Sequence, residues 1–328
     1  MWELPILESL MKNALINEIP DVRMIADDEL MTIEPHCRGL RAIHSPRTGN
    51  VNWQAVANAY GEDFVQSGGQ IRTGFEVTHI ESSMDHLDYP ILIRGMQRQG
   101  NQRRPFELQC KYLITCAGLQ GDRVARMTGC PTIPKIIPFR GDFMILKPEK
   151  SHLVRGNIYP VPDARFPFLG AHFNSGLGES VLLGPNAVLS LRREGYGLMD
   201  FNLRDAVESL TYPGLQRMIY KYFGVGMNEW MRAFSIRAQM KYLQRFIPEI
   251  SAEDVTRGPS GIRAQAVDKK GNLLDDFIMH QGTGSAGWRI VHVLGVPSPG
   301  ATSSLPIARL LISKSETQFN WPSTRKEK

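Results

Sequence analysis

The sequence has no apolar run of bilayer length, few cysteines and only a small excess of charge. A membrane-spanning helix needs about 20 consecutive apolar residues, and no stretch of the 328-residue chain approaches that length. The four cysteines, Cys37, Cys110, Cys116 and Cys130, are widely separated. They have neither the spacing of a metal site nor a preceding signal peptide, so we expect reduced thiols in a reducing compartment and no bound metal.

The charge balance argues against a nucleic-acid-binding protein. The chain contains 38 Lys and Arg against 33 Asp and Glu, which leaves a net charge of +5. Its densest basic run, RQGNQRR from Arg98 to Arg104, lies among Gly, Gln and Asn residues. Such a context is typical of a hairpin tip and not of a groove that follows phosphates. We therefore expect no nucleic-acid partner.

Common hydrolase and phosphotransfer motifs are absent as well. The chain has no G-x-S-x-G elbow, no H-E-x-x-H pair, no P-loop and no kinase motif set. His36 beside Cys37, and His79 with His86, lack the spacing and partners of metal ligands. The length and the 42% hydrophobic content are nevertheless enough for a large core in one or two domains.

The stretch from Arg257 to Leu311 is the most informative part of the chain. Gly261–Asp268 and Leu273–Met279 are predicted as short strands, and the intervening KKGN is a turn by composition, so the pair predicts a β-hairpin. Arg289–Val296, RIVHVLGV, is typical of a strand buried on both faces.

A loop of small residues follows this buried strand and leads into a helix. Pro297–Ser304 reads PSPGATSS, and the apolar spacing after it is helical. A strand, a small-residue loop and a helix together present backbone N–H groups and a positive helix end to an anion or an electron-rich ring edge. The plainer interpretation is a buried strand followed by a Ser/Thr N-cap at Thr302 or Ser303.

The preceding chain predicts two kinds of structure. Asn52 is expected to cap a helix over Trp53–Gln66, and the strand after it suggests an α–β step of a parallel sheet. YLITCAG (Tyr112–Gly118) predicts a buried strand that ends at a close backbone approach, with a helix from about Asp122. From Pro138 onward, strands, prolines and aromatics predict an antiparallel sheet. Two helices are then expected, over Asp205–Phe223 and Trp230–Ile247.

Several polar residues of the strand-rich region are candidates for binding a substrate. Arg140 is expected either to pair with Asp142 or to bind a carboxylate, and its neighbours favour the pairing. For Arg263 the same two alternatives stay open. His172 could accept a proton in an alcohol oxidation, although a lone histidine near aromatics is more often packed.

The ordered set of motifs resembles a known family. The segments FEVTHI, YLITCAGLQGDRVA, IIPFRGDF, GNIYPVPDARFPFLGAHF, KYLQRFIPEI, RGPSGIRAQAVDKKGNLLDDF and PSPGATSS together are similar to L-2-hydroxyglutarate dehydrogenases, a family of FAD-dependent, D-amino-acid-oxidase-like oxidoreductases. The resemblance covers about Leu4 to Ile312. It implies oxidation of L-2-hydroxyglutarate to 2-oxoglutarate by hydride transfer to flavin, with a protein base that takes the hydroxyl proton.

The same resemblance implies an α/β fold, with an incomplete Rossmann-like FAD-binding domain and an inserted α+β substrate domain built on an antiparallel sheet. Its expected parts are residues 1–137 (a partial FAD-binding domain, with part of the substrate domain at its N-terminal end), 138–256 (substrate domain), 257–312 (return to the FAD-binding domain) and 313–328 (a disordered polar tail).

The resemblance also assigns candidate site residues. The implied catalytic base is His172, and a small dicarboxylate would be held by Arg140, Tyr159, Arg263 and Gln265. The implied FAD contacts are Val77, Cys116, Ala117, Gly118, Ser298, Gly300, Ala301, Thr302 and Ser303. A mitochondrial location is implied, whereas the electron acceptor and membrane association stay open.

One feature of the family is missing from the start of this chain. Such enzymes begin with a strand, a G-x-G-x-x-G turn, a helix and an acidic residue for the ribose, and the N-terminal residues contain no such unit. We therefore expect reduced FAD affinity, exposed strand edges and impaired activity of the chain alone. Two alternatives follow: an inactive fragment that acts as a binding or regulatory module, or a related FAD-dependent hydroxy-acid or amine dehydrogenase.

Overall fold

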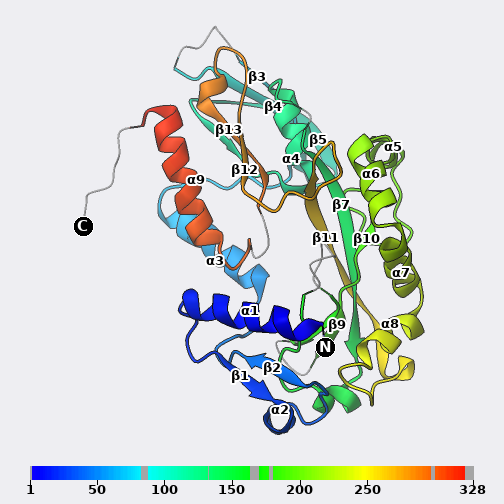
Figure 1. Cartoon of the computed structure of the whole chain (residues 1–328). Coiled ribbons are helices and arrows are strands. Elements are labelled where there is room, and N and C mark those ends of the chain that lie inside the picture. The colour runs from blue at the N-terminus through cyan, green and yellow to red at the C-terminus, as the bar shows by residue number, and fades with distance from the viewer. Residues whose placement is uncertain are drawn as a thin grey trace.

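The computed structural model describes residues 2–82, 88–131, 133–162, 170–176, 180–296 and 300–321. Figure 1 shows an N-terminal unit at the bottom, a long central pair of strands flanked by helices on one side, and smaller sheets above. The N-terminal unit consists of α1 (Glu3–Ile16), β1 (Arg23–Ala26), α2 (Asp27–Ile33) and β2 (Arg41–His44). Strands β1 and β2 pair antiparallel, and Ile25, Leu30 and Cys37 form the small core beneath them.

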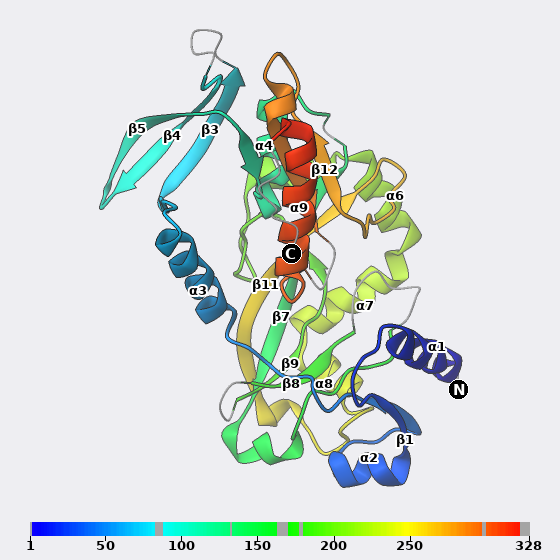
Figure 2. The ribbon, with the colours of Figure 1, turned by 90° about the vertical axis from the view of Figure 1, so that its left-hand side faces the viewer.

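Helix α3 (Trp53–Gln66) begins where the sequence predicts, at Asn52. The Asn52 side chain accepts hydrogen bonds from the backbone N–H groups of Gln54 and Ala55, at 3.0 and 3.1 Å, which satisfies two otherwise unpaired donors. No α3 residue is buried, and Figure 2 shows the helix standing apart from the central body.

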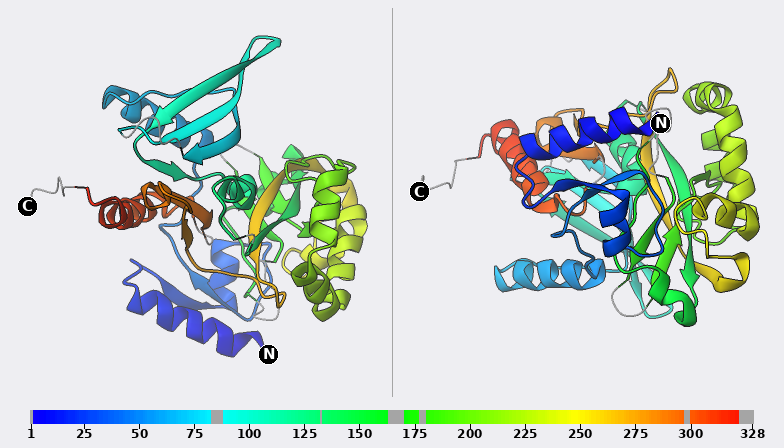
Figure 3. Two further views of the ribbon diagram at one scale, coloured as in Figure 1. Left: turned by 90° about the horizontal axis from the view of Figure 1, so that it is seen from above. Right: turned by 60° about the horizontal axis from the view of Figure 1, so that its bottom comes forward.

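The predicted parallel α–β step after α3 is wrong. Strand β3 (Phe75–Ser82) joins an antiparallel sheet of order β3-β4-β5, with β4 (Ile91–Gln99) and β5 (Gln102–Cys110). The Arg98–Arg104 run does form the tip of the β4–β5 hairpin, where Gly100 has a φ of 61°. β3 pairs antiparallel with β4 of this hairpin, so it does not need a parallel partner. Figure 3 shows the three strands projecting from the body.

A small mixed sheet has the strand order β12-β13-β6. Among the strands that the structure describes, two strands of this sheet pair in parallel. β6 (Leu113–Thr115) runs parallel to β13 (Ile290–Gly295), and β12 (Ile278–Gln281) pairs antiparallel on the other side of β13. Five of the six β13 residues are buried, as the apolar run predicts. Helix α4 (Gly121–Met127) and the 3₁₀ turn η1 (Gly118–Gln120) follow β6, and α9 (Ser304–Phe319) follows β13.

The expected hairpin of Gly261–Asp268 with Leu273–Met279 forms at its turn, but the predicted pairing of its two arms along their length is wrong. β11 (Val255–Val267) instead pairs along β7 (Lys135–Leu146), and β12 pairs with β13 in the other sheet. The turn predicted between them does form: the Asp268 N–H donates to the Asn272 carbonyl and the Leu274 N–H to the Ala266 carbonyl, both at 3.0 Å, and Val267 bridges Leu273. Pairing with β7 provides 11 registered positions, which a seven-residue hairpin arm cannot match.

The remaining strands complete an antiparallel sheet, as predicted for the region after Pro138. Its order is β10-β7-β9-β8, with β11 on β7; the shorter strands are β8 (His172–Ser175), β9 (Val181–Gly184) and β10 (Val188–Leu189). Four helices cover it: α5 (Leu203–Leu210), α6 (Pro213–Lys221), α7 (Phe223–Phe234) and α8 (Ile236–Leu243). The two predicted helices are therefore four, because Pro213 and Ser235 begin new helices.

The C-terminal region differs from the predicted polar tail. Helix α9 continues through residues 313–319, and Asn320 ends it with a left-handed φ of 51°. Phe319 is 1% exposed and stacks on Tyr112 with ring centroids 4.8 Å apart. Apolar burial of this ring holds the last turn of the helix onto the body. Residues 322–328 lie outside the described ranges.

Candidate active site

The register between β7 and β11 places the two candidate arginines on opposite faces of the sheet. Arg140 lies opposite Ile262, whereas Arg263 lies opposite Phe139. Because successive side chains of a strand alternate, residues one position apart in this ladder point to different sides. Arg140 and Arg263 therefore cannot bind the same small ligand directly.

Arg140 has the ion pair that its sequence neighbours favour. Its Nε lies 2.9 Å from Asp142 Oδ1, and its guanidinium also donates to the Gly197 carbonyl at 2.7 Å. The residue is 5% exposed. A buried arginine with these partners orders the segment around Gly197.

His172 is held in one orientation by its neighbours. Its Nδ1 lies 3.0 Å from the Gly170 carbonyl oxygen, so the proton of the neutral ring is on Nδ1 and Nε2 is left as an acceptor. Burial lowers the pKa of His172, and the positive charge of Arg263 lowers it further. The ring is therefore neutral near pH 7, as a proton acceptor must be.

Aromatic side chains surround this histidine. Tyr159 stacks on the ring with centroids 4.6 Å apart, and Phe143 meets it edge-on at 6.4 Å. The Tyr159 hydroxyl donates to Asn174 Oδ1 at 3.0 Å. Tyr159 is 47% exposed, so the histidine lies just beneath an accessible surface.

The structure brings three of the five predicted substrate-site residues together: His172, Tyr159 and Arg263. Burial lowers the pKa of Arg263, but a guanidinium keeps its charge in proteins. Gln265 is on the same face of β11 as Arg263, yet its amide points to the Ala266 and Leu274 carbonyls, at 3.5 Å from each. Sequence reasoning missed Phe143 and Asn174, which only tertiary packing places beside the cluster.

Most of the predicted cofactor residues follow the two strands of the parallel pair. Cys116, Ala117 and Gly118 follow β6 directly, and Gly300–Ser303 follow β13 within eight residues. The carboxyl ends of parallel strands meet at the same edge, where open α/β sheets bind their ligands. Gly118 has a φ of 48°, and a Cβ added there would meet nothing within 4 Å. This backbone is exposed and shaped for close approach by a ligand.

The start of α9 offers part of the donor set that the predicted anion site requires. Its N-cap is Ser303, and this side chain accepts no capping hydrogen bond. In the first turn, however, the Ser304 N–H donates to the Ala301 carbonyl at 3.2 Å and Pro306 has no N–H, so this helix end offers fewer donors than one that binds phosphate through its whole first turn. Ser298 lies outside the described residues. Val77, the predicted adenine contact, lies on β3 next to a β-bulge and packs against the Ile80 core between β3 and α4.

The residues of this edge fit part of a flavin-dinucleotide site. The uncapped helix end and the open Gly118 backbone suit a pyrophosphate and the ring edge that adjoins it. Neither Cys116–Gly118 nor Gly300–Ser303 contains an Asp or Glu, so these segments have no carboxylate that could bind a ribose.

His292 is a buried residue of this edge that sequence reasoning missed. It is fully buried on β13; its Nδ1 lies 2.8 Å from Thr115 Oγ1, and its Nε2 lies 2.7 Å from Thr128 Oγ1. Burial lowers the pKa of His292 to about 4, and the neighbouring His280 adds to the effect. The neutral ring ties β13 to the end of β6 and to the end of α4. The signal available was one histidine within the apolar run RIVHVLGV.

A second feature that the sequence reasoning missed is a run with dinucleotide-fingerprint spacing, GTGSAG from Gly282 to Gly287. It follows β12 and leads into the three-residue 3₁₀ turn η4 (Gly287–Arg289). A Cβ on Gly287 would lie 2.3 Å from the Gly282 carbonyl oxygen, so glycine is required for the turn to fold on itself. The run lacks the following helix of a phosphate cradle and is a structural turn.

Two further properties bear on the site's chemistry. Within the described ranges, His, Cys, Asp and Glu side chains do not gather in threes that could ligate a metal ion. None of the helices in those ranges combines the length and hydropathy that a bilayer crossing requires.

Comparison with known proteins adds the family context. A family profile described as FAD dependent oxidoreductase matches residues 2–314. The chain is 47% identical to the mitochondrial L-2-hydroxyglutarate dehydrogenase of Nematostella vectensis, over 97% of this chain and 70% of that protein. It is 44% identical to the mitochondrial human enzyme of that name (97% and 68% covered) and 41% identical to the Indibacter alkaliphilus L-2-hydroxyglutarate dehydrogenase (93% and 72%).

Solved structures agree on the fold. FAD-bound L-alpha-glycerophosphate oxidase from Mycoplasma pneumoniae superposes with a TM-score of 0.66 at 19% identity, covering 100% of this chain and 72% of that one. Glycine oxidase from Bacillus cereus gives a TM-score of 0.57 at 10% identity, covering 95% and 71%. These likenesses concern the fold alone.

Proposed function

The chain belongs to the family of FAD-dependent oxidoreductases, among the L-2-hydroxyglutarate dehydrogenases, and we propose that it oxidises L-2-hydroxyglutarate to 2-oxoglutarate. Identity of 39–49% over nearly the whole chain, with relatives of one activity, favours this function over an inactive binding module or an amine dehydrogenase. The mitochondrial names of the animal relatives support a mitochondrial location.

The observation that carries the proposal is the neutral, oriented His172 beside the cation Arg263. Bound FAD supplies the acceptor for the hydride from substrate C2. Oxidation of the alcohol also requires that the hydroxyl proton leaves, and His172 Nε2 is the available acceptor. Arg263 suits a carboxylate of the substrate, because its guanidinium presents several donors in one plane.

The aromatic neighbours and the cofactor edge have supporting roles. Tyr159 and Phe143 pack against the His172 ring and restrict its rotation. Thr302, Ser303 and the Gly118 backbone are the proposed contacts with FAD, with Val77 at the adenine end. Arg140 orders the Gly197 segment through its contact with the carbonyl there.

The test is reconstitution of the purified chain with FAD, followed by removal of free cofactor. We expect a retained flavin absorption band that bleaches with L-2-hydroxyglutarate but not with its D-enantiomer, and formation of 2-oxoglutarate. A chain that retains FAD yet does not react would contradict the substrate assignment. A chain that retains none would contradict activity of these 328 residues without changing the family.

Arg263→Gln distinguishes binding from chemistry. Loss of a carboxylate partner is expected to raise KM for L-2-hydroxyglutarate by about 10–100-fold, since a hydrogen bond between charged groups contributes roughly 1.5–3 kcal/mol. An unchanged KM would remove Arg263 from the substrate site.

A further inference from the structure

A polar cavity lies on the other face of β7 from Arg263. Its volume is about 120 Å³, and its walls include Asp142, Asn186, Arg232, Gln239, Arg257 and Ser260. Ser260 pairs with Asp142 in the β7–β11 ladder, two positions along from the Arg140–Ile262 pair, so these residues share a face. Arg263 is one position away from that pair and points to the opposite side. Phe143 lies between the two sites, lining the cavity and touching the His172 ring.

Gln239 is the unusual member of this wall. It is 2% exposed on α8, and neither its Nε2 nor its Oε1 has a hydrogen-bond partner among the residues that the structure describes. A buried amide without partners costs about 1–3 kcal/mol for each unsatisfied group, so such atoms in native proteins call for a missing partner. Both a donor and an acceptor of one amide are left open, and Gln239 is one of the residues that line the cavity.

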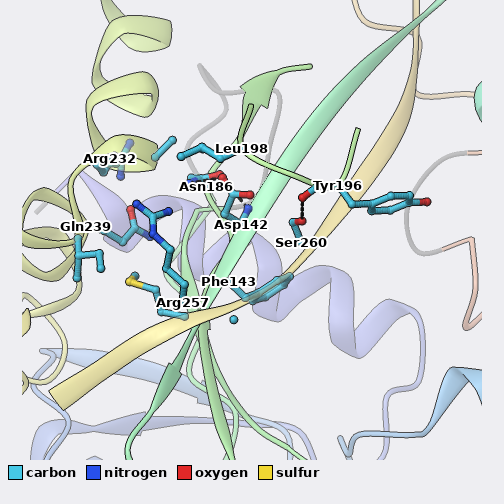
Figure 4. A pocket seen from close by; sticks show the side chains of 13 residues that line it. Asp142, Phe143, Asn186, Tyr196, Leu198, Arg232, Gln239, Arg257 and Ser260 are labelled. Atoms are coloured by element: carbon cyan, nitrogen blue, oxygen red, sulfur yellow. Dashed lines mark hydrogen bonds between the residues drawn. The ribbon is translucent and has the colours of Figure 1, made fainter. Parts of the chain in front are cut away.

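The charge around the cavity favours an anion. Arg257 makes no ion pair or side-chain hydrogen bond with another described residue, and Arg232 contributes a second guanidinium that lies 4.6 Å over the Tyr242 ring. The Asp142 carboxylate is neutralised by Arg140 at 2.9 Å. Figure 4 shows the Arg257 side chain rising from β11 into the space that the Gln239 amide, Asp142 and Asn186 share.

We propose that this cavity binds a small 2-hydroxycarboxylate as a second ligand, separate from the site at His172 and Arg263. A carboxylate would accept from Arg257 and from Gln239 Nε2, and the adjacent hydroxyl would donate to Gln239 Oε1. One ligand thus satisfies both open atoms of the amide and the unpaired guanidinium. The cavity is large enough for a molecule of a few heavy atoms, since one water needs only about 10–15 Å³ of this kind of space.

The test uses glycolate and acetate, which differ by the hydroxyl alone. Their dissociation constants are measured by saturation-transfer NMR on the whole chain and on the variants Arg257→Gln, Gln239→Met, Arg263→Gln and Arg237→Gln. Arg237 is an exposed residue of α8 and is the matched control for loss of a charge. Gln239→Met keeps the side-chain length and removes the two open polar atoms, so its thermal stability should not fall.

We expect glycolate to bind more tightly than acetate to the original chain, and about tenfold or more weakly to Arg257→Gln and Gln239→Met. In Gln239→Met the preference for glycolate should vanish. Arg237→Gln and Arg263→Gln should retain the original affinity. Binding that disappears in Arg263→Gln but persists in Arg257→Gln would assign the probe to the proposed substrate site and overturn the proposal. Absence of saturable binding to any chain would mean that water alone fills the cavity, and would overturn it too.

Discussion

The two regions of the proposed active site are built very differently. The substrate sheet pairs β11 with β7 over 11 registered positions and packs a core that includes Phe173, Leu183 and Leu243, all fully buried. The cofactor edge rests on three registered pairs between β6 and β13, and in the described part of the chain β6 pairs on one side only. The substrate residues are therefore held by extensive packing, whereas the cofactor residues depend on a few specific contacts such as those of His292.

A network of buried charges joins the two regions. Arg193, which follows β10, pairs with Asp122 of α4; their Nη2 and Oδ2 atoms are 2.9 Å apart, and the side chains are 2% and 1% exposed. Asp122 also accepts from the Ile136 N–H at the start of β7. Arg123 extends the network to Asp205 and Glu208 on α5. These ion pairs thus fasten α4, on the cofactor side, to the substrate sheet and to α5.

The largest effect is expected within the substrate region. His172→Gln should lower kcat by about 10²–10⁴-fold, the usual contribution of a positioned proton acceptor. The acid limb of the pH–rate profile should disappear with it. His36→Gln, an exposed histidine paired with Glu249, is the matched control and should leave the profile intact. Steady-state kinetics with an artificial acceptor dye measure both, and an unchanged kcat would exclude His172 as the base.

The next largest effect is expected on stability, when the buried ion pair between the two regions is broken. Asp122→Asn leaves Arg193 buried without its counter-charge and should lower the free energy of unfolding by about 3–5 kcal/mol. Arg103→Gln, which breaks an exposed pair with Glu76, should change it by less than about 1 kcal/mol. Urea unfolding compares the two variants. Equal small effects would show that the regions are stable independently of this network.

The cofactor edge should be the more acid-sensitive region. Folding lowers the pKa of His292 from 6.5 to about 4. Between these values the unfolded chain binds a proton at this residue that the folded chain does not, so its contribution to stability falls as the pH falls. Complete loss amounts to roughly 3 kcal/mol, because one pKa unit corresponds to about 1.4 kcal/mol. Above pH 6.5 the residue should contribute no pH dependence.

Comparison of the original chain with His292→Gln isolates this contribution from that of other groups. The free energy of unfolding should depend less on pH in the variant between pH 6.5 and about 4. Parallel curves would mean that His292 titrates in the folded protein as it does in the unfolded chain.

The smallest effect concerns the Gly118 turn. Gly118→Ala meets no steric clash but imposes a side chain on a left-handed backbone, which should lower stability by about 1 kcal/mol. It should also weaken FAD binding if the backbone there approaches the cofactor. Gly49→Ala, at an open position where φ is not left-handed, is the matched control and should be neutral. Thermal melting and flavin titration measure the two effects.

Local chemistry made some of these features predictable. Asn52 has a side chain that can cap a helix, and RIVHVLGV has the apolar run of a fully buried strand; both form where the sequence predicts. The Arg140–Asp142 pair followed from two opposite charges on one strand face, two residues apart. The cofactor loops followed from their positions after strands, although their contacts with FAD remain predictions.

Pairing partners were the main source of error. Gly261–Asp268 has strand character, but nothing in its composition says whether it pairs with the next strand or with one more than 100 residues earlier. Likewise, the order of α3 and β3 along the chain suggests a step of a parallel sheet. In the structure β3 instead joins the antiparallel sheet with β4 and β5. The polar character of residues 313–319 concealed the one ring, Phe319, that anchors them.

The sequence by itself therefore determined the local elements, the family and most of the candidate residues, because caps, apolar periods and motif order are written in neighbouring positions. The tertiary structure alone decided which residues act together. It separated Arg140 from Arg263 by one step of the β7–β11 register, and it placed Gln239 and Arg257 around one cavity. Such relations depend on strand pairing and helix packing between distant segments, which long-range burial selects and no local pattern specifies.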